Sequence, residues 1–174
     1  MSENFRAWSS SHPWVLGDLR LHRAALQATE ARALESYPSE ACGFLCGPRE
    51  EPRRLERFIP EVNEADKYHA LDPERFPRTS RTYFKINELR AQRLFDEGEA
   101  QGQPIKVIFH SHCDSSAHFS AEDAATFVQG GELMWPCAFL VLSVGPEGLE
   151  ERRLWRYEPS EGRFVESPLE IVDE

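Results

Sequence analysis

Two histidines and one aspartate lie close together in the sequence and could bind one metal ion: His110, His112 and Asp123. The apolar, β-branched run 105–110 predicts a strand that ends at the first histidine. Side chains at positions i and i+2 of a strand point to the same face, so both imidazoles can reach one ion. Asp123 falls in the first turn of an expected helix and completes the set. Two nitrogens and one carboxylate leave a fourth tetrahedral position for water, as in catalytic zinc sites.

A hydrolytic site also needs a proton acceptor that is not a metal ligand, and Glu40 is the candidate. It directly precedes the apolar run 41–47, which predicts a buried strand. If that strand neighbours the histidine-bearing strand, Glu40 can reach the water at the metal. Each part also has an ordinary explanation. Ser120 and Asp123 fit a helix capping box, and a loop carboxylate such as Glu40 is usually solvated.

The order and spacing of these residues resemble the motif of the JAMM (MPN+, JAB-domain) zinc metalloproteases, in their compact prokaryotic form. The resemblance extends over residues 21–157, and the segment 38–47 (PSEACGFLCG) is similar to the family's first strand. The residues that match the motif are Glu40, His110, His112, Ser120 and Asp123.

The resemblance implies a function and a role for each motif residue. Zinc would be bound by His110, His112 and Asp123, Glu40 would be the general base, and Ser120 would stabilise the tetrahedral oxyanion. The activity implied is cleavage of peptide or isopeptide bonds after the C-terminal Gly-Gly of a ubiquitin-like or sulfur-carrier protein. The resemblance also implies a single MPN/JAB-like domain of cytidine-deaminase-like architecture.

One position departs from the family pattern. Proline commonly follows the second histidine, and this chain has Cys113 there. The substitution leaves the ligands intact but changes the expected loop geometry. A thiolate beside zinc could regulate the site, either as an inhibitory ligand or as a redox switch. Adjacent strand residues face opposite ways, which favours a bystander role for Cys113.

Three other functions are weighed against the peptidase. A catalytically silent MPN-type scaffold for protein assembly is the main alternative, although such relatives usually lack a ligand that this chain keeps. A zinc nucleoside deaminase needs His-x-Glu and Pro-Cys-x-x-Cys. Here Pro136 and Cys137 are present, but Leu140 replaces the second cysteine. A thiol redox sensor is disfavoured because Cys42 and Cys46 fit a buried strand as small apolar residues.

Composition limits the compartment and the partners. The chain has 174 residues, 40% of them hydrophobic, and a formal net charge of −10. This length predicts one domain over 17–174, preceded by a flexible leader at 1–16 in which Trp8 and Trp14 dock onto the body. The negative charge disfavours nucleic acid and anionic membranes. Without an apolar span or a secretory signal, we expect a cytoplasmic protein with reduced thiols. The oligomeric state is left open.

The remaining pattern predicts an α/β (α+β) domain with a mixed sheet flanked by helices. Leu89, Leu94 and Phe95 are expected to be core positions of the second helix, and 63–82 has no clear assignment. Helices are predicted over 21–35, 86–102 and 121–128, and strands over 41–47, 55–62, 105–110, 137–144 and 149–157.

Overall fold

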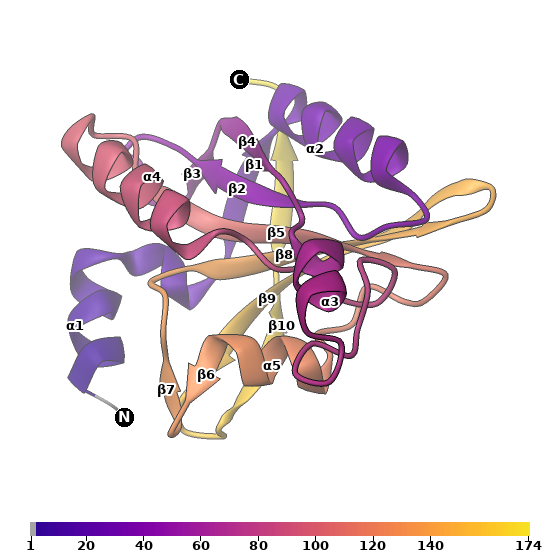
Figure 1. Ribbon diagram of the computed structural model, residues 1–174. Coiled ribbons are helices and arrows are strands. Elements are labelled where there is room, and N and C mark those ends of the chain that lie inside the picture. Colours follow the sequence, from indigo (N-terminus) through magenta and orange to yellow (C-terminus); the bar gives the residue numbers. More distant parts are fainter. Residues whose placement is uncertain (1–2) are drawn as a thin grey trace.

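The central element is a six-stranded sheet. Its strands are β2 (Cys42–Cys46), β4 (Arg57–Glu61), β5 (Ile105–Cys113), β8 (Ala138–Gly145), β9 (Gly148–Glu158) and β10 (Arg163–Ser167). The computed structural model describes residues 3–174, and Figure 1 shows the sheet crossing the middle of the molecule. The strand order is β10-β9-β8-β5-β2-β4, with β5 and β8 parallel and the other neighbours antiparallel. The predicted mixed sheet in an α/β fold is confirmed.

Strand β5 is the inner strand on which the histidines lie. It pairs with β2 on one side and with β8 on the other, so its backbone groups are satisfied by both neighbours. Its first eight residues are buried, in keeping with their apolar sequence. The strand extends beyond the predicted end at His110, because pairing with β8 continues through Cys113 and Val144. Both histidines therefore lie within the sheet rather than beyond it.

Three helices occupy the regions predicted for them: α2 (Arg23–Ser36), α4 (Glu88–Ala100) and α5 (Ala121–Phe127). Helix α4 packs on the sheet through Phe95, whose ring lies 5.7 Å from that of Phe44. Helix α5 does so through Phe127, 4.8 Å from Phe139. The prediction that Leu89 is a core residue was wrong, since it is 86% exposed. The buried positions of α4 are Ala91, Phe95 and Gly98, and Leu89 falls outside the stripe that they form.

Several short elements were not predicted. A second, parallel sheet has the order β11-β1-β3, and a two-stranded ribbon pairs β6 with β7. A short helix, α3, lies within the unassigned segment 63–82. These elements are too short for periodicity to distinguish them from loops. Their bounds are β1 (Leu19–His22), β3 (Arg54–Leu55), β11 (Leu169–Val172), β6 (Val128–Gln129), β7 (Glu132–Leu133) and α3 (Ala65–Leu71).

The N-terminal segment packs against the body. It forms α1 (Glu3–Ser11) and the 3-10 helix η1 (Pro13–Leu16). Trp14 is 1% exposed and its indole N–H donates to the Pro136 carbonyl at 2.7 Å, while Trp8 packs against the core. The expected docking of both tryptophans is therefore observed, and Phe5, Trp14 and Val15 bury their side chains. The division into leader and domain stays a prediction. Across 3–174, none of the helices has the length and apolarity required to cross a bilayer.

Candidate metal centre

Three candidate ligand atoms from His110, His112 and Asp123 lie close to one another beside β5. His110 Nε2 lies 3.0 Å from Asp123 Oδ2, His112 Nε2 lies 3.2 Å from the same oxygen, and the two nitrogens are 3.2 Å apart. Two atoms about 2.1 Å from a tetrahedral zinc ion would themselves be roughly 3.4 Å apart. The triangle formed by these three atoms is therefore close to one face of a zinc coordination tetrahedron.

Strand pairing brings Glu40 to the same place. β2 runs antiparallel to β5 with Cys42 opposite His110, so the chain just before β2 lies level with His112. The Ser111 N–H donates to the Ala41 carbonyl at 3.0 Å, which fixes this alignment. A carboxylate oxygen of Glu40 and one nitrogen of each histidine lie within 4.8 Å of one another. The neighbouring strands expected from the sequence are thus present.

The two imidazoles are oriented by different means. His112 Nδ1 lies 2.8 Å from the Ser116 carbonyl, an acceptor, so Nδ1 carries a proton, and Nε2 presents its lone pair when the ring is neutral. His110 is completely buried, and its Nδ1 has no hydrogen-bond partner. Its ring instead stacks on Phe84, with centroids 4.4 Å apart and an interplanar angle of 18°. Packing therefore sets the orientation of His110, and a hydrogen bond sets that of His112.

Burial and mutual charge fix the protonation states of this cluster. Burial lowers the pKa of His110. Burial also acts to lower the pKa of His112, but its hydrogen bonds with Asp123 and the Ser116 carbonyl outweigh that effect and raise it. For Asp123, burial acts to raise the pKa, whereas His110 and the bonds to both imidazoles hold it well below its usual range. A neutral His110 and an ionised Asp123 are the forms that bind metal.

Glu40 has the opposite electrostatic character. It is 5% exposed, and burial raises the pKa of its carboxyl to about 8. A carboxyl with a pKa near the working pH can both accept and return a proton, as a general base must. The two buried carboxyls of the site, Glu40 and Asp123, thus have pKa values displaced in opposite directions. Such a separation is typical of sites that assign different roles to similar groups.

Comparison with known proteins identifies the family. The sequence matches the prokaryotic homologs of the JAB domain over residues 22–158. The chain belongs to this family. The JAB domain here is 28% identical over 149 residues to a protein named CysO-cysteine peptidase in Mycobacterium tuberculosis, a match that covers 86% of this chain and 88% of the relative. The protein of that name in Mycobacterium bovis matches equally well.

Solved structures agree on the fold of the JAB domain. A protein from Desulfitobacterium hafniense superposes with a TM-score of 0.66 at 22% identity, covering 90% of this chain and 94% of that one. A protein from Salinibacter ruber gives a TM-score of 0.57 at 20% identity, with coverages of 89% and 92%. A JAB1/MPN domain protein from Archaeoglobus fulgidus gives 0.50 at 15% identity, with coverages of 90% and 98%. At these identities the likeness shows a shared fold.

A capping box places Asp123 in the JAB domain site. The Asp123 N–H donates to Ser120 Oγ and the Ser120 N–H donates to Asp123 Oδ2, both at 3.0 Å. The carboxylate oxygen that faces both histidines is therefore held by the first turn of α5. The helix-capping explanation for Ser120 and Asp123 is compatible with a metal-binding one. The same oxygen, Asp123 Oδ2, accepts the capping hydrogen bond and faces both imidazoles.

The loop between the histidines and α5 is anchored at several points. The Asp114 N–H donates to the Val144 carbonyl at 2.8 Å, the Ala117 N–H to the Glu151 carboxylate at 2.8 Å, and the Trp155 indole to the Ala117 carbonyl at 2.9 Å. Cys113 at its start is half-buried, and burial raises the pKa of its thiol to about 11. Its regulatory role stays a prediction.

Sequence reasoning missed two contributors to the site. Phe84 comes from beyond the segment without an assignment, and nothing local in the sequence signals its stacking on His110. Ser116 contributes a backbone carbonyl, which any residue type could supply. The interaction partner of a buried ligand histidine is a property of the tertiary structure, so the sequence motif predicts the ligands but not the groups that orient them.

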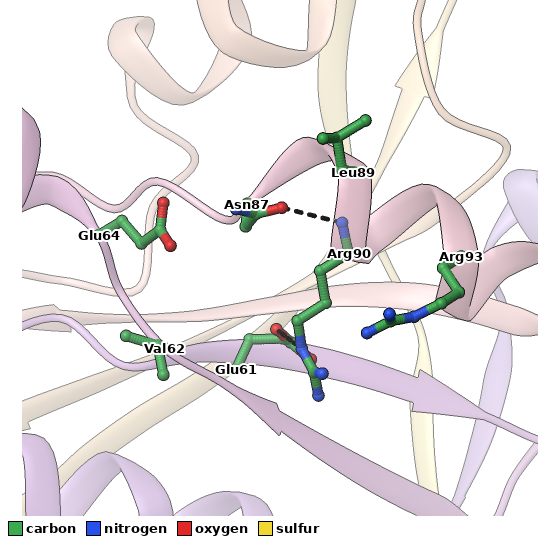
Figure 2. Close-up of a pocket in the computed structure, with 7 residues that line it drawn as sticks. All are labelled: Glu61, Val62, Glu64, Asn87, Leu89, Arg90 and Arg93. Atoms are coloured by element: carbon green, nitrogen blue, oxygen red, sulfur yellow. Dashed lines mark hydrogen bonds and ion pairs between the residues drawn. The ribbon is translucent and has the colours of Figure 1, made fainter.

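Two hollows on this JAB domain lie beside the cluster. A hollow of about 590 Å³ beside α1 and α4 includes Phe84, Phe95 and Trp135 among its lining residues. Phe84 therefore separates this hollow from His110. A second hollow, of about 380 Å³, lies at the beginning of α4, where Arg90 pairs with Glu61. Figure 2 shows the residues that line it. The second hollow contains none of the site residues predicted from the sequence.

Proposed function

We propose that this protein is a zinc-dependent peptidase or isopeptidase that cleaves after the C-terminal Gly-Gly of a ubiquitin-like or sulfur-carrier protein. The observation that carries the proposal is the convergence of His110 Nε2, His112 Nε2 and Asp123 Oδ2 within 3.2 Å, with Glu40 beside them. Family membership and a relative named CysO-cysteine peptidase support hydrolase chemistry.

The residues fit a zinc ion. Two imidazole nitrogens and one carboxylate oxygen are the donor types of catalytic zinc sites. The second nitrogen of His112 is held by a carbonyl, as is common for ligand histidines. Without a cation, the two Nε2 atoms, 3.2 Å apart, would compete for one carboxylate oxygen. His110, His112 and Asp123 are thus the proposed ligands.

In the proposed reaction, Glu40 moves the proton. Bound zinc supplies a Lewis acid that activates water and polarises the scissile carbonyl. Glu40 accepts the proton of the attacking water and delivers it to the departing amine. A nearby cation favours the ionised carboxylate, so Glu40 can act as a base at neutral pH despite its burial. Its closed surroundings keep the proton from bulk water until the amine leaves.

Ser120 is proposed to stabilise the oxyanion. Its oxygen accepts from the Asp123 N–H, and its own hydroxyl proton stays available to donate. A preorganised donor of this kind lowers the barrier because no reorganisation is needed as negative charge develops. The capping box thereby holds both a proposed ligand, Asp123, and a proposed oxyanion donor, Ser120, in one rigid turn.

The relative's name favours a sulfur-carrier protein as the substrate. The similarity to CysO-cysteine peptidase spans most of both chains, so the comparison includes the whole site. We therefore infer that the scissile bond joins a terminal glycine to cysteine. The products would be the carrier protein with a free Gly-Gly end and the released amino acid.

The test combines metal content with cleavage of a defined probe. The probe is a sulfur-carrier protein that ends in Gly-Gly and is extended by one cysteine, followed by mass spectrometry of the intact protein. Near-stoichiometric zinc and the loss of one cysteine mass are expected. Zinc-loaded protein that leaves this probe and a Gly-Gly isopeptide conjugate intact would contradict the proposal and favour the catalytically silent scaffold.

A further inference from the structure

The backbone of Glu40 is held from outside the sheet. The Glu40 N–H donates to the Ser80 carbonyl at 2.7 Å, and the Glu40 carbonyl accepts from Asn63 Nδ2 at 2.9 Å. Both partners lie in the segment 63–85, which follows β4 and contains α3. The regular pairing of β2 with β5 begins only at Cys42. The position of Glu40 therefore depends on this segment as well as on the sheet.

Asn63 uses its complete hydrogen-bonding capacity. Its Nδ2 donates to the carbonyls of Glu40 and Tyr83 at 2.9 and 3.0 Å. Its Oδ1 accepts from the N–H groups of Ala65 and Lys85, both at 3.0 Å. An amide offers two donors and two acceptor positions, and all four are matched here. Because two carbonyls require the amino group and two N–H groups require the oxygen, the orientation of the side chain is fixed.

The same segment contacts the other parts of the site. Phe84, next to Tyr83, stacks on His110. Arg78 pairs with Glu122 at 3.3 Å, beside Asp123 in the first turn of α5. Asn63 closes this segment on itself by joining its first residues to Tyr83 and Lys85. The Asn63 side chain thus joins the turn before β2 to residues 83–85, where Phe84 stacks on His110.

We propose that Asn63 is a positioning residue that sets the place of the Glu40 carboxylate for proton transfer. This inference rests on the proposed role of Glu40 as the general base. The side chain of Asn63 acts through the main-chain carbonyl of Glu40, the same residue whose side chain carries the carboxylate. Loss of the donor would let the turn before β2 shift, and a misplacement of about 1 Å can cost on the order of 100-fold in rate.

The decisive variant is Asn63→Asp. It keeps the size of the side chain and both acceptor contacts, but it replaces the donor to Glu40 and Tyr83 by an oxygen that repels their carbonyls. Asn63→Ala removes all four bonds and serves if the aspartate variant fails to fold. The matched control is Asn87→Ala. Asn87 is also an asparagine that accepts from a backbone N–H, that of Arg90 at 2.9 Å, and it caps α4 without touching Glu40 (Figure 2).

The kinetic experiment uses zinc-loaded protein and the Gly-Gly-Cys carrier probe. Asn63→Asp should lower kcat at least tenfold, with KM changed less than twofold and zinc content unchanged. Asn87→Ala should stay within twofold of the wild type in both constants, even if its Tm falls. A kcat loss shared equally by Asn87→Ala, or a change in KM alone, would show that Asn63 serves only the stability of the fold.

A second readout does not depend on turnover. Amide exchange measured by NMR should be at least tenfold faster at Glu40 in Asn63→Asp than in the wild type or Asn87→Ala, with β5 amides unchanged. Equal exchange at Glu40 in all three proteins would overturn the inference. If the wild type leaves the probe uncut, the proposed function fails, and amide exchange alone decides whether Asn63 holds the turn.

Discussion

Strand β5 carries buried polar side chains at both ends, and the two ends differ in how those groups are satisfied. Near its start, the Lys106 ammonium donates to the carbonyls of Pro48, Glu51 and Arg54 at 2.8, 2.9 and 2.9 Å. An ammonium has three donors, and all are matched. The ring of Trp14 lies 5.3 Å from the same nitrogen. This end is a closed structural site that ties η1 and the loop after β2 to the sheet.

At the other end of β5, the Nε2 atoms of His110 and His112 face a single carboxylate oxygen, that of Asp123. Buried polar groups that share one partner in this way are costly, and a cation among the three atoms would complete them. Burial of polar groups is therefore not itself a sign of function. Incomplete satisfaction, together with donors that converge on one point, distinguishes the proposed metal site from the lysine site.

The largest expected effect is on turnover, from Glu40→Gln. The amide keeps the shape of the side chain but cannot accept the proton, so kcat should fall by about 1,000-fold or more. Zinc content measured by mass spectrometry should match that of the wild type, because Glu40 is proposed as a base rather than a ligand. Full turnover by a zinc-loaded glutamine variant would remove Glu40 from the mechanism.

Asp123→Ala should produce the next largest effect, on metal binding. Loss of a ligand is expected to weaken zinc affinity by more than the 10- to 100-fold typical of partners that only orient ligands. It also removes one half of the capping box, which should cost roughly 1 kcal/mol of unfolding free energy. Ala124→Gly, next to it on α5, is the control for helix stability. Full zinc occupancy in Asp123→Ala would contradict the assignment of this residue as a ligand.

The sequence predicts the proposed ligands of this site but not the groups that arrange them. His110, His112 and Asp123 are found from strand alternation and a helix start, both local patterns. Phe84 and Asn63 act across long stretches of chain, and no periodicity marks them. Long apolar runs such as β8 were located closely, whereas β10 and β11, short and half-exposed, were not. Sequence patterns predict a residue's role where the residues that it contacts are close in sequence. They do not predict that role where it depends on contacts between distant parts of the chain.

A moderate effect, on stability alone, is expected for Lys106→Met. Three carbonyls lose their donor, which should cost about 3 kcal/mol of unfolding free energy. Urea unfolding at pH 7 measures the loss. Zinc content and kcat of the folded variant should stay within twofold of the wild type. A loss of zinc in the fully folded variant would show that the two ends of β5 are coupled.

The pH dependence of stability sharpens this prediction. Burial lowers the pKa of Lys106 from its ordinary value of 10.5 to about 8. Between these pH values the unfolded chain binds more protons than the folded one, so the unfolding free energy rises with pH. The wild type should therefore gain stability relative to Lys106→Met as the pH increases from 8 to 10.5. If the stability difference between the wild type and Lys106→Met instead shrinks over this range, hydrogen bonding to the three carbonyls, rather than burial, dominates the pKa of Lys106.

The smallest effect is expected at Cys113, one residue beyond His112. Burial raises the pKa of this thiol to about 11, so at pH 7.5 well under 1% is thiolate, the form that binds metal or reacts with oxidants. Cys113→Ala should change kcat and zinc content less than twofold, measured with and without prior exposure to hydrogen peroxide. If peroxide inactivates the wild type while Cys113→Ala is spared, the thiol is a redox switch. A sulfur-based control would then act at the same end of β5 as the proposed metal site.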